Sequence, residues 1–378
     1  MILLGVNTGS SSVRLALWEA RGDRPLALAR VPATSDPAAA LSPFLEGRSV
    51  DAIVHRVVHG GSALVDPCRI DDAVRAEIAR LVPLAPLHNP RALTWIDGCR
   101  AALPTTPQIA VFDTAFFARL PEVATLYALP RALTRRAGLR RYGFHGLAHR
   151  SMWEAWRRTR ARGDSDRVIT IQLGGGCSMA AIVDGRAIET SMGMTPLGGL
   201  MMQTRPGDLD PGVLLHLINE CDVAPTELAR MLAEESGLRG VSGRTGEVRE
   251  LLPLEAAGDE DARRALALYV HRARAQLGAF LVQLGALGGV DAILFGGGVG
   301  EHEPQIRARI LAGMEWCGVR LDARASQIDA GASQIDAGAS QGLVRLHHEA
   351  SRVAVYVAAV DEERLLRDDA VLLLERKP

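Results

Sequence analysis

The stretch ILLGVNTGSSSVRLAL, residues 2–17, places two short apolar runs on either side of a turn rich in glycine and serine. Apolar residues alternate from Val13 to Leu17, which is typical of a strand, and the polar turn predicts a hairpin. The stretch VITIQLGGGCSMAAIV, residues 168–183, repeats this form. Two such units in one chain predict two domains of related architecture.

The rest of the chain alternates between strand-like runs and amphipathic stretches with helical spacing. The predicted strands are 2–6, 13–17, 52–58, 109–112, 168–173, 179–183, 292–295 and 353–357, and the predicted helices are 73–81, 90–102, 149–160, 211–218, 261–284 and 303–314. This mixture predicts an α/β protein. We place the break between the domains near FFARLPEV, residues 116–123.

The composition excludes several classes of protein. The chain has 378 residues, 48% of them hydrophobic, and a net charge of -1, which gives no bulk attraction to nucleic acid or to an acidic membrane. The five scattered cysteines form no CxxC pair and favour a reducing cytoplasm over a disulfide framework or a zinc site. The glycine-rich apolar stretch Leu277–Val290 is too short to cross a bilayer.

Three segments have the form of a strand followed by a glycine-rich turn: GVNTGSSS (5–12), IQLGGGCS (171–178) and ILFGGGVGE (293–301). Glycine lets backbone N–H groups approach an anion, and the helix expected after the third segment would point its N-terminus at a ligand. None has the spacing of a P-loop or a dinucleotide-binding fingerprint. We predict a phosphate-binding protein of another design, in which a hairpin turn also presents the phosphate donors.

Histidines, arginines and aspartates gather in Gly- and Pro-rich segments that mostly follow strands: HRVVHGG (55–61), LAPLHNP (84–90), FDTAF (112–116), RRYGFHGLAH (140–149) and TSMGMTPLGGL with TRPGDLDP (190–211). Together they suggest phosphoryl transfer, because arginine neutralises phosphoryl oxygens in bidentate geometry. A single histidine is more often structural. We expect Asp208 and Asp210 to cap a helix that starts near Pro211.

With these motifs the chain resembles the acetokinase family of short-chain carboxylate kinases, in the superfamily of sugar kinases, actin and heat-shock ATPases. The resemblance runs along nearly the whole chain in consistent order, through NTGSSSVR, HRVVHGG, APLHNP, FDTAF, RRYGFHG, TSMGMTPLGGL, TRPGDLDP, GGGVGE and VDEE. It implies direct, reversible transfer of the ATP γ-phosphoryl group to acetate.

The resemblance also implies site residues. Arg56 and Arg205 would bind the carboxylate and the phosphoryl oxygens, and His145 would steady the same charge. Asp113 would hold Arg56 or act as an acid/base residue. The remaining implied residues are Asn7 and Glu362 for Mg²⁺ (or Mn²⁺); Ser10, Ser12 and Arg14 for phosphates; Val58, Leu87, His88, Phe144 and Pro196 for the small acid; and Gln172, Leu173, Gly174, Gly175, Gly176, Glu247, Val248, Arg249, Gly298, Val299, Gly300, Glu301 and His302 for ATP or ADP.

The implied fold is two duplicated actin-like domains of the ribonuclease H type, with the active site in the cleft between them. Residues 1–117 and about 363–378 would form the N-terminal domain, to which the C-terminal helix returns. Residues 118–362 would form the C-terminal domain with the nucleotide loops. The resemblance also implies a homodimer.

Several residues depart from the family pattern, mostly on the nucleotide side. The pattern His-Leu-Gly-Asn-Gly becomes QLGGG (172–176), so that Gln172 and Gly175 replace a histidine and an asparagine. Met-Gly-Thr-Arg becomes MQTR with Gln203, and a final asparagine becomes His302. The family's lysine becomes Arg14, but the chain has only one lysine, at Lys377, so we interpret Arg14 as a conservative replacement.

These departures leave alternatives open. The chain could act on another short acid such as propionate, or use another donor such as pyrophosphate. A non-catalytic nucleotide sensor is a third possibility. The repeated SQIDAGA at 326–339 is either a functional repeat or a small tandem duplication, and we favour a duplication in a surface loop.

Overall fold

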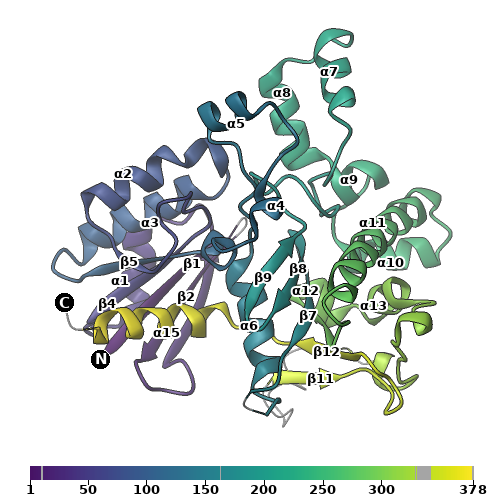
Figure 1. Ribbon diagram of the computed structural model, residues 1–378. Helices are drawn as coiled ribbons and strands as arrows, with labels where there is room; N and C mark the ends of the chain where they lie inside the picture. The colour runs from purple at the N-terminus through teal and green to yellow at the C-terminus, as the bar shows by residue number, and fades with distance from the viewer. Residues whose placement is uncertain (10–11, 162, 328, 330–341, 377–378) are drawn as a thin grey trace. The chain divides into compact units, whose positions relative to one another are not determined.

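The computed structural model describes residues 1–9, 12–161, 163–327, 329 and 342–376 (Figure 1). Backbone contacts divide the chain into two compact units. The first unit comprises Met1–Ala118, Phe144–Leu147 and Asp361–Pro378, and the second comprises Arg119–Gly143 and Ala148–Val360. Each unit is built around one six-stranded mixed sheet.

The first unit has strands in the order β3-β2-β1-β4-β6-β5. The bounds are β1 Ile2–Thr8, β2 Ser12–Glu19, β3 Ala27–Pro32, β4 Ala52–Val57, β5 Cys68–Arg69 and β6 Gln108–Phe112. Strands β1, β4 and β6 are parallel to one another, whereas β2, β3 and β5 pair antiparallel with their neighbours. The predicted hairpin of residues 2–17 is therefore present as β1 and β2.

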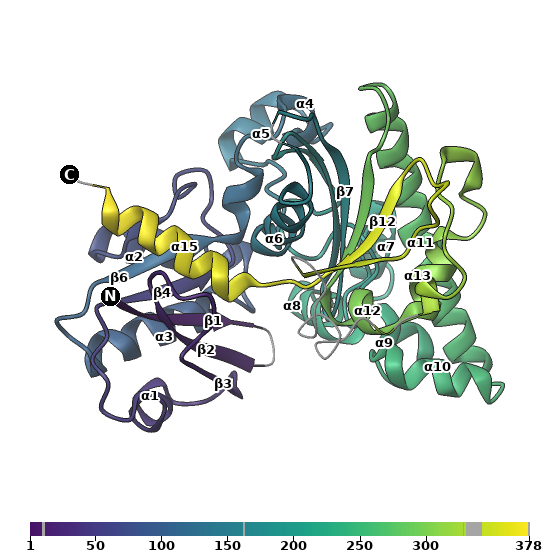
Figure 2. The same ribbon diagram turned by 90° about the horizontal axis from the view of Figure 1, so that it is seen from below.

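Helices cover both faces of this sheet. The helical segments are α1 Pro37–Leu45, α2 Asp72–Arg80, η1 Val82–Leu84, α3 Asn89–Ala102, η2 Asp113–Phe117 and α15 Glu362–Glu375. Leu3 packs with Leu365 of α15, whereas Leu4 packs on the opposite face with Leu41 of α1 and Trp95 of α3. Successive strand residues point to opposite faces, so β1 carries no polar side chain from Ile2 to Val6, before Asn7 and Thr8. Figure 2 shows α15, in yellow, beside β1 and β4.

The second unit repeats this topology, with strands in the order β11-β12-β10-β7-β8-β9. The bounds are β7 Arg167–Leu173, β8 Cys177–Val183, β9 Arg186–Thr190, β10 Ala292–Gly296, β11 Leu343–Arg345 and β12 Ala354–Ala358. Strands β7, β10 and β12 are parallel, and β7 and β8 form the second hairpin. The same strand order in both sheets confirms the predicted duplicated α/β fold.

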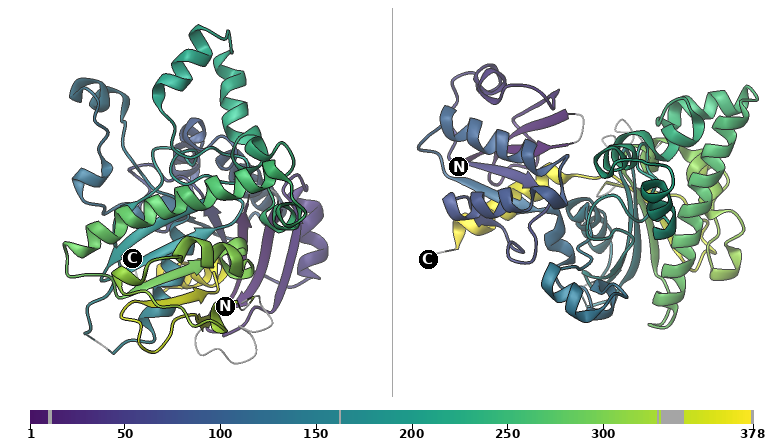
Figure 3. Two further views of the ribbon diagram at one scale, coloured as in Figure 1. Left: turned by 90° about the vertical axis from the view of Figure 1, so that its right-hand side faces the viewer. Right: turned by 90° about the horizontal axis from the view of Figure 1, so that it is seen from above.

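The second unit also contains most of the helices. They are α4 Glu122–Thr125, α5 Arg131–Ala137, α7 Pro211–Asn219, α8 Pro225–Arg230, η3 Met231–Glu235, α9 Gly237–Ser242, α10 Val248–Ala256, α11 Glu260–Gly285, α12 Gly297–His302, α13 Pro304–Leu311, η4 Glu315–Cys317 and η5 Ala325–Gln327, together with most of α6, Gly146–Arg157. Met152 of α6 packs with Leu294 of β10, and α11 contacts β7 and β8 (Figure 3).

The structure corrects the expectation for the third glycine-rich segment. The segment after β10 is a six-residue helix, α12, rather than an open turn, and the next helix is α13. The repeated SQIDAGA lies largely outside the described residues, at 328 and 330–339. Within the described chain, no helix combines the length and apolar character needed to cross a membrane.

Candidate active site

The first group of predicted residues gathers where the parallel strands of the first unit end. Asn7 near the end of β1 lies opposite Arg56 of β4 and, on its other side, opposite Arg14 of β2. Asp113 follows β6 directly, and Glu362 begins α15. The carboxyl ends of parallel strands meet at one edge of a sheet, so the topology brings these side chains together.

Arg56 is held by three residues at once. Its Nε and Nη2 donate to the Asp113 carboxylate, with distances of 3.1 Å from Nε to Oδ1 and 2.7 Å from Nη2 to Oδ2. Its Nη1 donates to Asn7 Oδ1 at 3.0 Å and lies 3.3 Å from Glu362 Oε2. Because Arg56 and Asp113 are 8% and 0% exposed, this guanidinium has little freedom to reorient. The arrangement favours the first of the two predicted roles of Asp113, holding Arg56.

Sequence reasoning missed Glu363, a further member of this group. Asn7 Nδ2 donates to Glu362 Oε2 at 2.8 Å and to Glu363 Oε1 at 2.9 Å. Arg14 contacts the same two oxygens. Its Nη2 lies 3.1 Å from Glu362 Oε2, and its Nε lies 3.1 Å from Glu363 Oε1. Both glutamates stand in the first turn of α15, where the helix dipole favours negative charge. The acidic pair in VDEE was the available signal.

Burial and charge shift the ionisation of this group. Burial disfavours charge on Glu362, but Arg56, Arg14 and the hydrogen bond from Asn7 outweigh it and lower the pKa of that carboxyl. Burial raises the pKa of Glu363, and Arg14 opposes this only in part. Burial also opposes the charge of Arg56, yet Asp113 and Glu362 raise the pKa of its guanidinium. Glu362 and Arg56 are thus a permanent ion pair at neutral pH.

The predicted magnesium ligands carry oxygen atoms of the kind that Mg²⁺ prefers. Asn7 Oδ1 already accepts from Arg56, and Glu362 Oε2 already contacts Arg56, so an ion here would have few protein ligands. Nowhere in the described residues do three His, Cys, Asp or Glu side chains gather into a metal-binding group. A magnesium ion at Glu362 would therefore complete its shell with water and phosphate oxygens, which is usual for this metal.

His145 occupies a conformation that side chains rarely adopt. Its φ is +57°, although it carries a Cβ. The next residue, Gly146, packs so closely on Asp113 that a Cβ there would lie 1.9 Å from the Asp113 carbonyl oxygen. The N–H of Leu147 also bonds the Asp113 carboxylate. The strained loop thus fixes His145 beside the residue that holds Arg56, and such strain often marks functional sites.

Four of the predicted acid-binding residues belong to the first unit and lie in or near the loop that follows β4. Val58 and Phe144 are buried, and the Phe144 ring meets the His59 ring edge-on, with centroids 5.3 Å apart. The buried amide of Asn89 accepts from His59 N–H at 3.2 Å and donates to its carbonyl at 3.1 Å. This holds the loop next to α3, and Leu87 and His88, both partly buried, directly precede Asn89. Pro196 belongs to the second unit.

In the second unit, two of the glycine-rich segments touch each other. Gly297, which begins α12 with φ +78°, is so close to the β7–β8 hairpin that a Cβ would lie 2.5 Å from both Gln172 Nε2 and the Leu173 carbonyl oxygen. The Glu301 carboxylate accepts from Gly297 N–H at 3.0 Å. Only glycine permits this approach. The loop Gly174–Gly176 and the start of α12 therefore lie side by side, with Gly298 exposed and Val299 and Gly300 buried beneath.

The other predicted nucleotide and phosphate residues lie as follows. Glu247 directly precedes α10 without a capping hydrogen bond from its side chain, the Val248 side chain is buried, and Arg249 is exposed. His302 Nδ1 lies 2.9 Å from Asp329 Oδ1. Ser12 accepts from Arg30 at 2.8 Å, and Ser10 lies outside the described residues.

Arg205 is a buried cation without a carboxylate partner. It is 7% exposed, and its Nη1 donates to the Pro196 carbonyl at 2.6 Å. Among the described residues, no acidic side chain forms an ion pair with it. Burial lowers the pKa of its guanidinium, and the Cys177 thiol opposes this shift only in part. Buried arginines are normally paired, so this position suits an anionic ligand.

Comparisons with known proteins agree with this chemistry. A sequence model of the acetokinase family matches residues 44–367. The chain is 43% identical over 322 residues to an acetate kinase of Clavibacter michiganensis subsp. michiganensis, a match that covers 85% of this chain and 78% of the relative.

The chain belongs to the acetokinase family.

Solved structures of the acetokinase family have the same fold. An acetate kinase of Porphyromonas gingivalis superposes with a TM-score of 0.85 at 32% identity, covering 99% of this chain and 100% of that one. A propionate kinase of Francisella tularensis subsp. tularensis gives 0.86 at 30% identity, covering 97% and 98%. The predicted family is confirmed, and membership makes the chain a phosphotransferase with a carboxyl group as acceptor.

Other polar residues have structural roles within this acetokinase fold. Asp210 caps α7 through Gly212 N–H, as predicted, whereas Asp208 instead accepts from Gly199 N–H at 2.7 Å. That expectation for Asp208 was wrong. His149 is fully buried, and its two ring nitrogens lie 2.7 Å from Thr170 Oγ1 and 2.8 Å from Ser178 Oγ.

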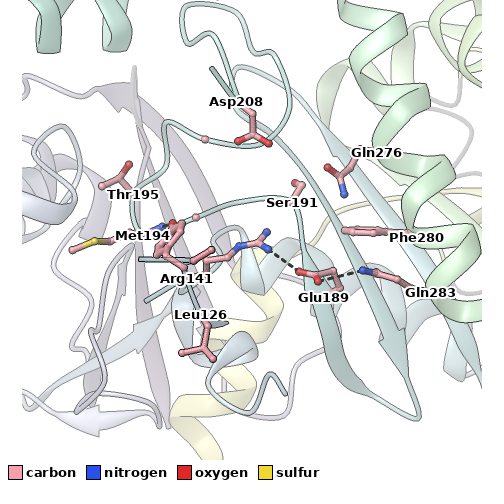
Figure 4. Close-up of a pocket in the computed structure, with 14 residues that line it drawn as sticks. Leu126, Arg141, Glu189, Ser191, Met194, Thr195, Asp208, Gln276, Phe280 and Gln283 are labelled. Carbon is pink, nitrogen blue, oxygen red and sulfur yellow. Dashed lines mark hydrogen bonds and ion pairs between the residues drawn. The ribbon is translucent and has the colours of Figure 1, made fainter. Parts of the chain in front are cut away.

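A pocket of about 520 Å³ in the second unit contains none of the predicted acetokinase site residues (Figure 4). Its charged groups are already engaged: Arg141 lies 3.2 Å from Glu189, which also accepts from Gln283 at 3.4 Å. The Tyr127 hydroxyl accepts from Met194 N–H at 2.8 Å. Among the residues that the structure describes, the arginine of this pocket is therefore paired with a carboxylate, whereas Arg205 is not.

Proposed function

We propose that this acetokinase catalyses the reversible, Mg²⁺-dependent transfer of the ATP γ-phosphoryl group to acetate, giving acetyl phosphate and ADP. An acetate oxygen attacks the γ-phosphorus in line, and the bond from that phosphorus to the β,γ-bridging oxygen breaks as ADP leaves. Acetate is already ionised at neutral pH, so no base has to remove a proton. Catalysis then depends on position and on stabilisation of phosphoryl charge.

The observation that carries the proposal is the buried Arg205, which has no acidic partner among the described residues. A phosphoryl group or a carboxylate supplies the missing charge, and the guanidinium fork can bind either in bidentate fashion. We assign Arg56 to the same oxygens, because Asp113, Asn7 and Glu362 hold it in one orientation. We assign His145 to the transition-state charge.

We further propose that Asn7 and Glu362 hold the magnesium ion. When bound, the ion neutralises charge on the phosphates of the donor. The low pKa of Glu362 keeps its carboxylate charged at neutral pH, and Arg14 and Asn7 hold it toward the edge of the sheet. The nucleotide itself is assigned to the surface made by Gly174–Gly176 and α12.

A second short acid is a specific alternative. The similar fold of the Francisella propionate kinase supports it, and an extra methylene changes binding by only about 1–3 kcal/mol in an apolar pocket. Pyrophosphate remains an alternative donor because residues 172, 175 and 203 depart from the family pattern. We propose acetate and ATP as the main pair.

The deciding experiment measures acyl phosphate, trapped as the hydroxamate, from acetate, propionate and butyrate with either ATP or pyrophosphate. The expected result is the highest kcat/KM for acetate with ATP. Absence of acyl phosphate with every pair, despite measurable nucleotide binding, would contradict the enzymatic function and favour a nucleotide sensor.

We also propose a cytoplasmic homodimer. In the second unit, α7 buries none of its residues, and Val213 and Leu215 are 46% and 59% exposed (Figure 1). An apolar helix of this kind suits a second copy of the chain. Val213→Glu with Leu215→Glu should therefore give a monomer in light scattering.

The cytoplasmic location rests on the cysteines. All five lie in the described residues and none forms a disulfide, which supports a reducing compartment.

A further inference from the structure

The side chain of Gln203 lies over Gly175 in the β7–β8 hairpin loop. A Cβ built on Gly175 would stand 3.2 Å from Gln203 Oε1 and 3.7 Å from its Cδ. Gly175 is exposed, and its φ lies outside the left-handed region. Its backbone conformation is therefore one that a residue with a side chain can adopt. The amide of Gln203 therefore occupies the space that a side chain at residue 175 would enter.

The backbone of Gln203 is fixed between two segments assigned to the nucleotide. Its N–H donates to the Gly175 carbonyl at 3.3 Å, and its carbonyl accepts from Arg239 N–H at 2.9 Å. On the other side, a Cβ on Gly246 would lie 2.7 Å from the Gln203 carbonyl oxygen and 3.0 Å from its Cβ. Gln203 is thus held between Gly175 and the loop that precedes α10, two residues before Arg205.

Two amides at this loop have unused hydrogen-bonding capacity. The side chain of Gln203 bonds no residue that the structure describes, although it is only partly exposed. Gln172 Oε1 is buried and has no hydrogen-bond partner. Polar atoms in such positions gain from a ligand that offers complementary groups. Both amides border Gly174–Gly176, where a phosphorylated ligand is expected.

We propose that Gln203 is a donor-binding residue whose side-chain amide contacts phosphate oxygens of the phosphoryl donor above Gly175. The inference rests on the proposed function, which supplies the donor. It also explains two departures noted in the sequence as one exchange. The family pattern has an amide at position 175 and glycine at 203, whereas this chain has glycine at 175 and an amide at 203. Asparagine and glutamine carry the same donor and acceptor groups.

The first test replaces Gln203 by leucine, which keeps the volume and removes the amide. Calorimetry measures the Kd of ATP, ADP and pyrophosphate with Mg²⁺ and without acetate. We expect Gln203→Leu to raise the Kd of the donor about tenfold and to leave the KM for acetate unchanged. Gln276→Leu, on α11, is the matched control and should change neither. An unchanged donor Kd in Gln203→Leu would overturn the inference.

The second test exchanges the two residues. Gly175→Asn alone should weaken donor binding, because its Cβ meets the Gln203 amide, whereas Gly175→Asn with Gln203→Gly should restore the Kd to within about threefold of the original chain. A double variant no better than the sum of the single variants overturns the proposal.

The two proposals fail in different ways. Donor binding that depends on Gln203, in a chain that forms no acyl phosphate, removes the proposed function and leaves the inference standing. Normal acyl phosphate formation, with a donor Kd that does not change when Gln203 is replaced, overturns the inference and leaves the proposed function standing. If the unaltered chain binds neither ATP nor pyrophosphate, both are overturned.

Discussion

Replacement of Asp113 by asparagine tests whether this buried carboxylate holds Arg56 or transfers a proton. The carboxylate accepts from Arg56 through both Nε and Nη2, and from Leu147 N–H. An asparagine keeps one acceptor oxygen but turns an NH₂ group toward the guanidinium or toward the backbone donor. Arg56 then keeps Asn7 and Glu362 as its remaining partners.

The expected magnitude follows from burial. Removing one partner of a buried ion pair costs about 3–5 kcal/mol, and Glu362 at 3.3 Å offsets part of this. We therefore expect the unfolding free energy to fall by about 3 kcal/mol. If the same energy is lost from the positioning of Arg56 in the transition state, kcat falls about a hundredfold.

The assay combines hydroxamate kinetics from pH 5.5 to 8.5 with denaturant unfolding. Asp97→Asn is the matched control, because Asp97 also binds an arginine through two oxygens, at 2.7 Å and 2.5 Å, but its side chain is 45% exposed. Such surface pairs contribute about 1 kcal/mol or less. A holding role predicts reduced activity at every pH with an unchanged profile. Complete loss of activity with unchanged stability, or loss of one limb of the profile, would refute it.

Three further predictions concern the two site arginines, the glycine at the start of α12, and the buried His149. Arg205→Ala should lower kcat by orders of magnitude without lowering the unfolding free energy, because Arg205 has no acidic partner among the described residues. Arg56→Ala should lower both kcat and the unfolding free energy, because Arg56 is paired with Asp113. Near-normal turnover in either variant contradicts the role assigned to that arginine. Gly297→Ala should raise the nucleotide Kd, because its Cβ would lie 2.5 Å from Gln172 and Leu173. Gly285→Ala is the control, because its Cβ would meet nothing within 4 Å, and its nucleotide Kd should not change. Equal nucleotide binding by both variants would contradict a contact between the nucleotide and the start of α12. Burial lowers the pKa of His149 to about 3, so below pH 6.5 the unfolded chain binds a proton that the folded chain does not. This group should therefore lower the free energy of unfolding by about 1.4 kcal/mol for each pH unit between pH 5.5 and 4.5. Urea unfolding at several pH values should show that the unfolding free energy of His149→Gln depends less steeply on pH, by that amount.

Much of the fold was predictable because its signals are local. Each hairpin shows as apolar residues flanking a glycine-rich turn, and helices such as α3 and α11 show their apolar spacing. Strand β3 was missed because its residues alternate only between half-buried and exposed, without a strongly apolar face. Helix α12 was missed because glycine normally disfavours a helix, and only its packing on Gln172 and Leu173 explains the glycine at its start.

The candidate site was predictable in part. Asn7, Arg56 and Asp113 stand at or just after the ends of predicted strands, and the structure shows these strands to be parallel, so the residues meet at one edge. The partner of Asn7 is 355 residues away at Glu362, and no local pattern connects them. The resemblance supplied Glu362, and the structure added Glu363 through its contacts with Asn7 and Arg14.

By itself, the sequence determined the α/β class, the two similar hairpins and the glycine-rich loops, and its arginine, histidine and aspartate motifs indicated phosphoryl transfer. These properties follow from periodicity, turn chemistry and residue type, which act over a few neighbouring positions. Only the tertiary structure decided that Arg205 is buried without a carboxylate and that Gln203 lies over Gly175. Burial and close approach depend on residues distant in the chain, and each can be known only when the chain is folded.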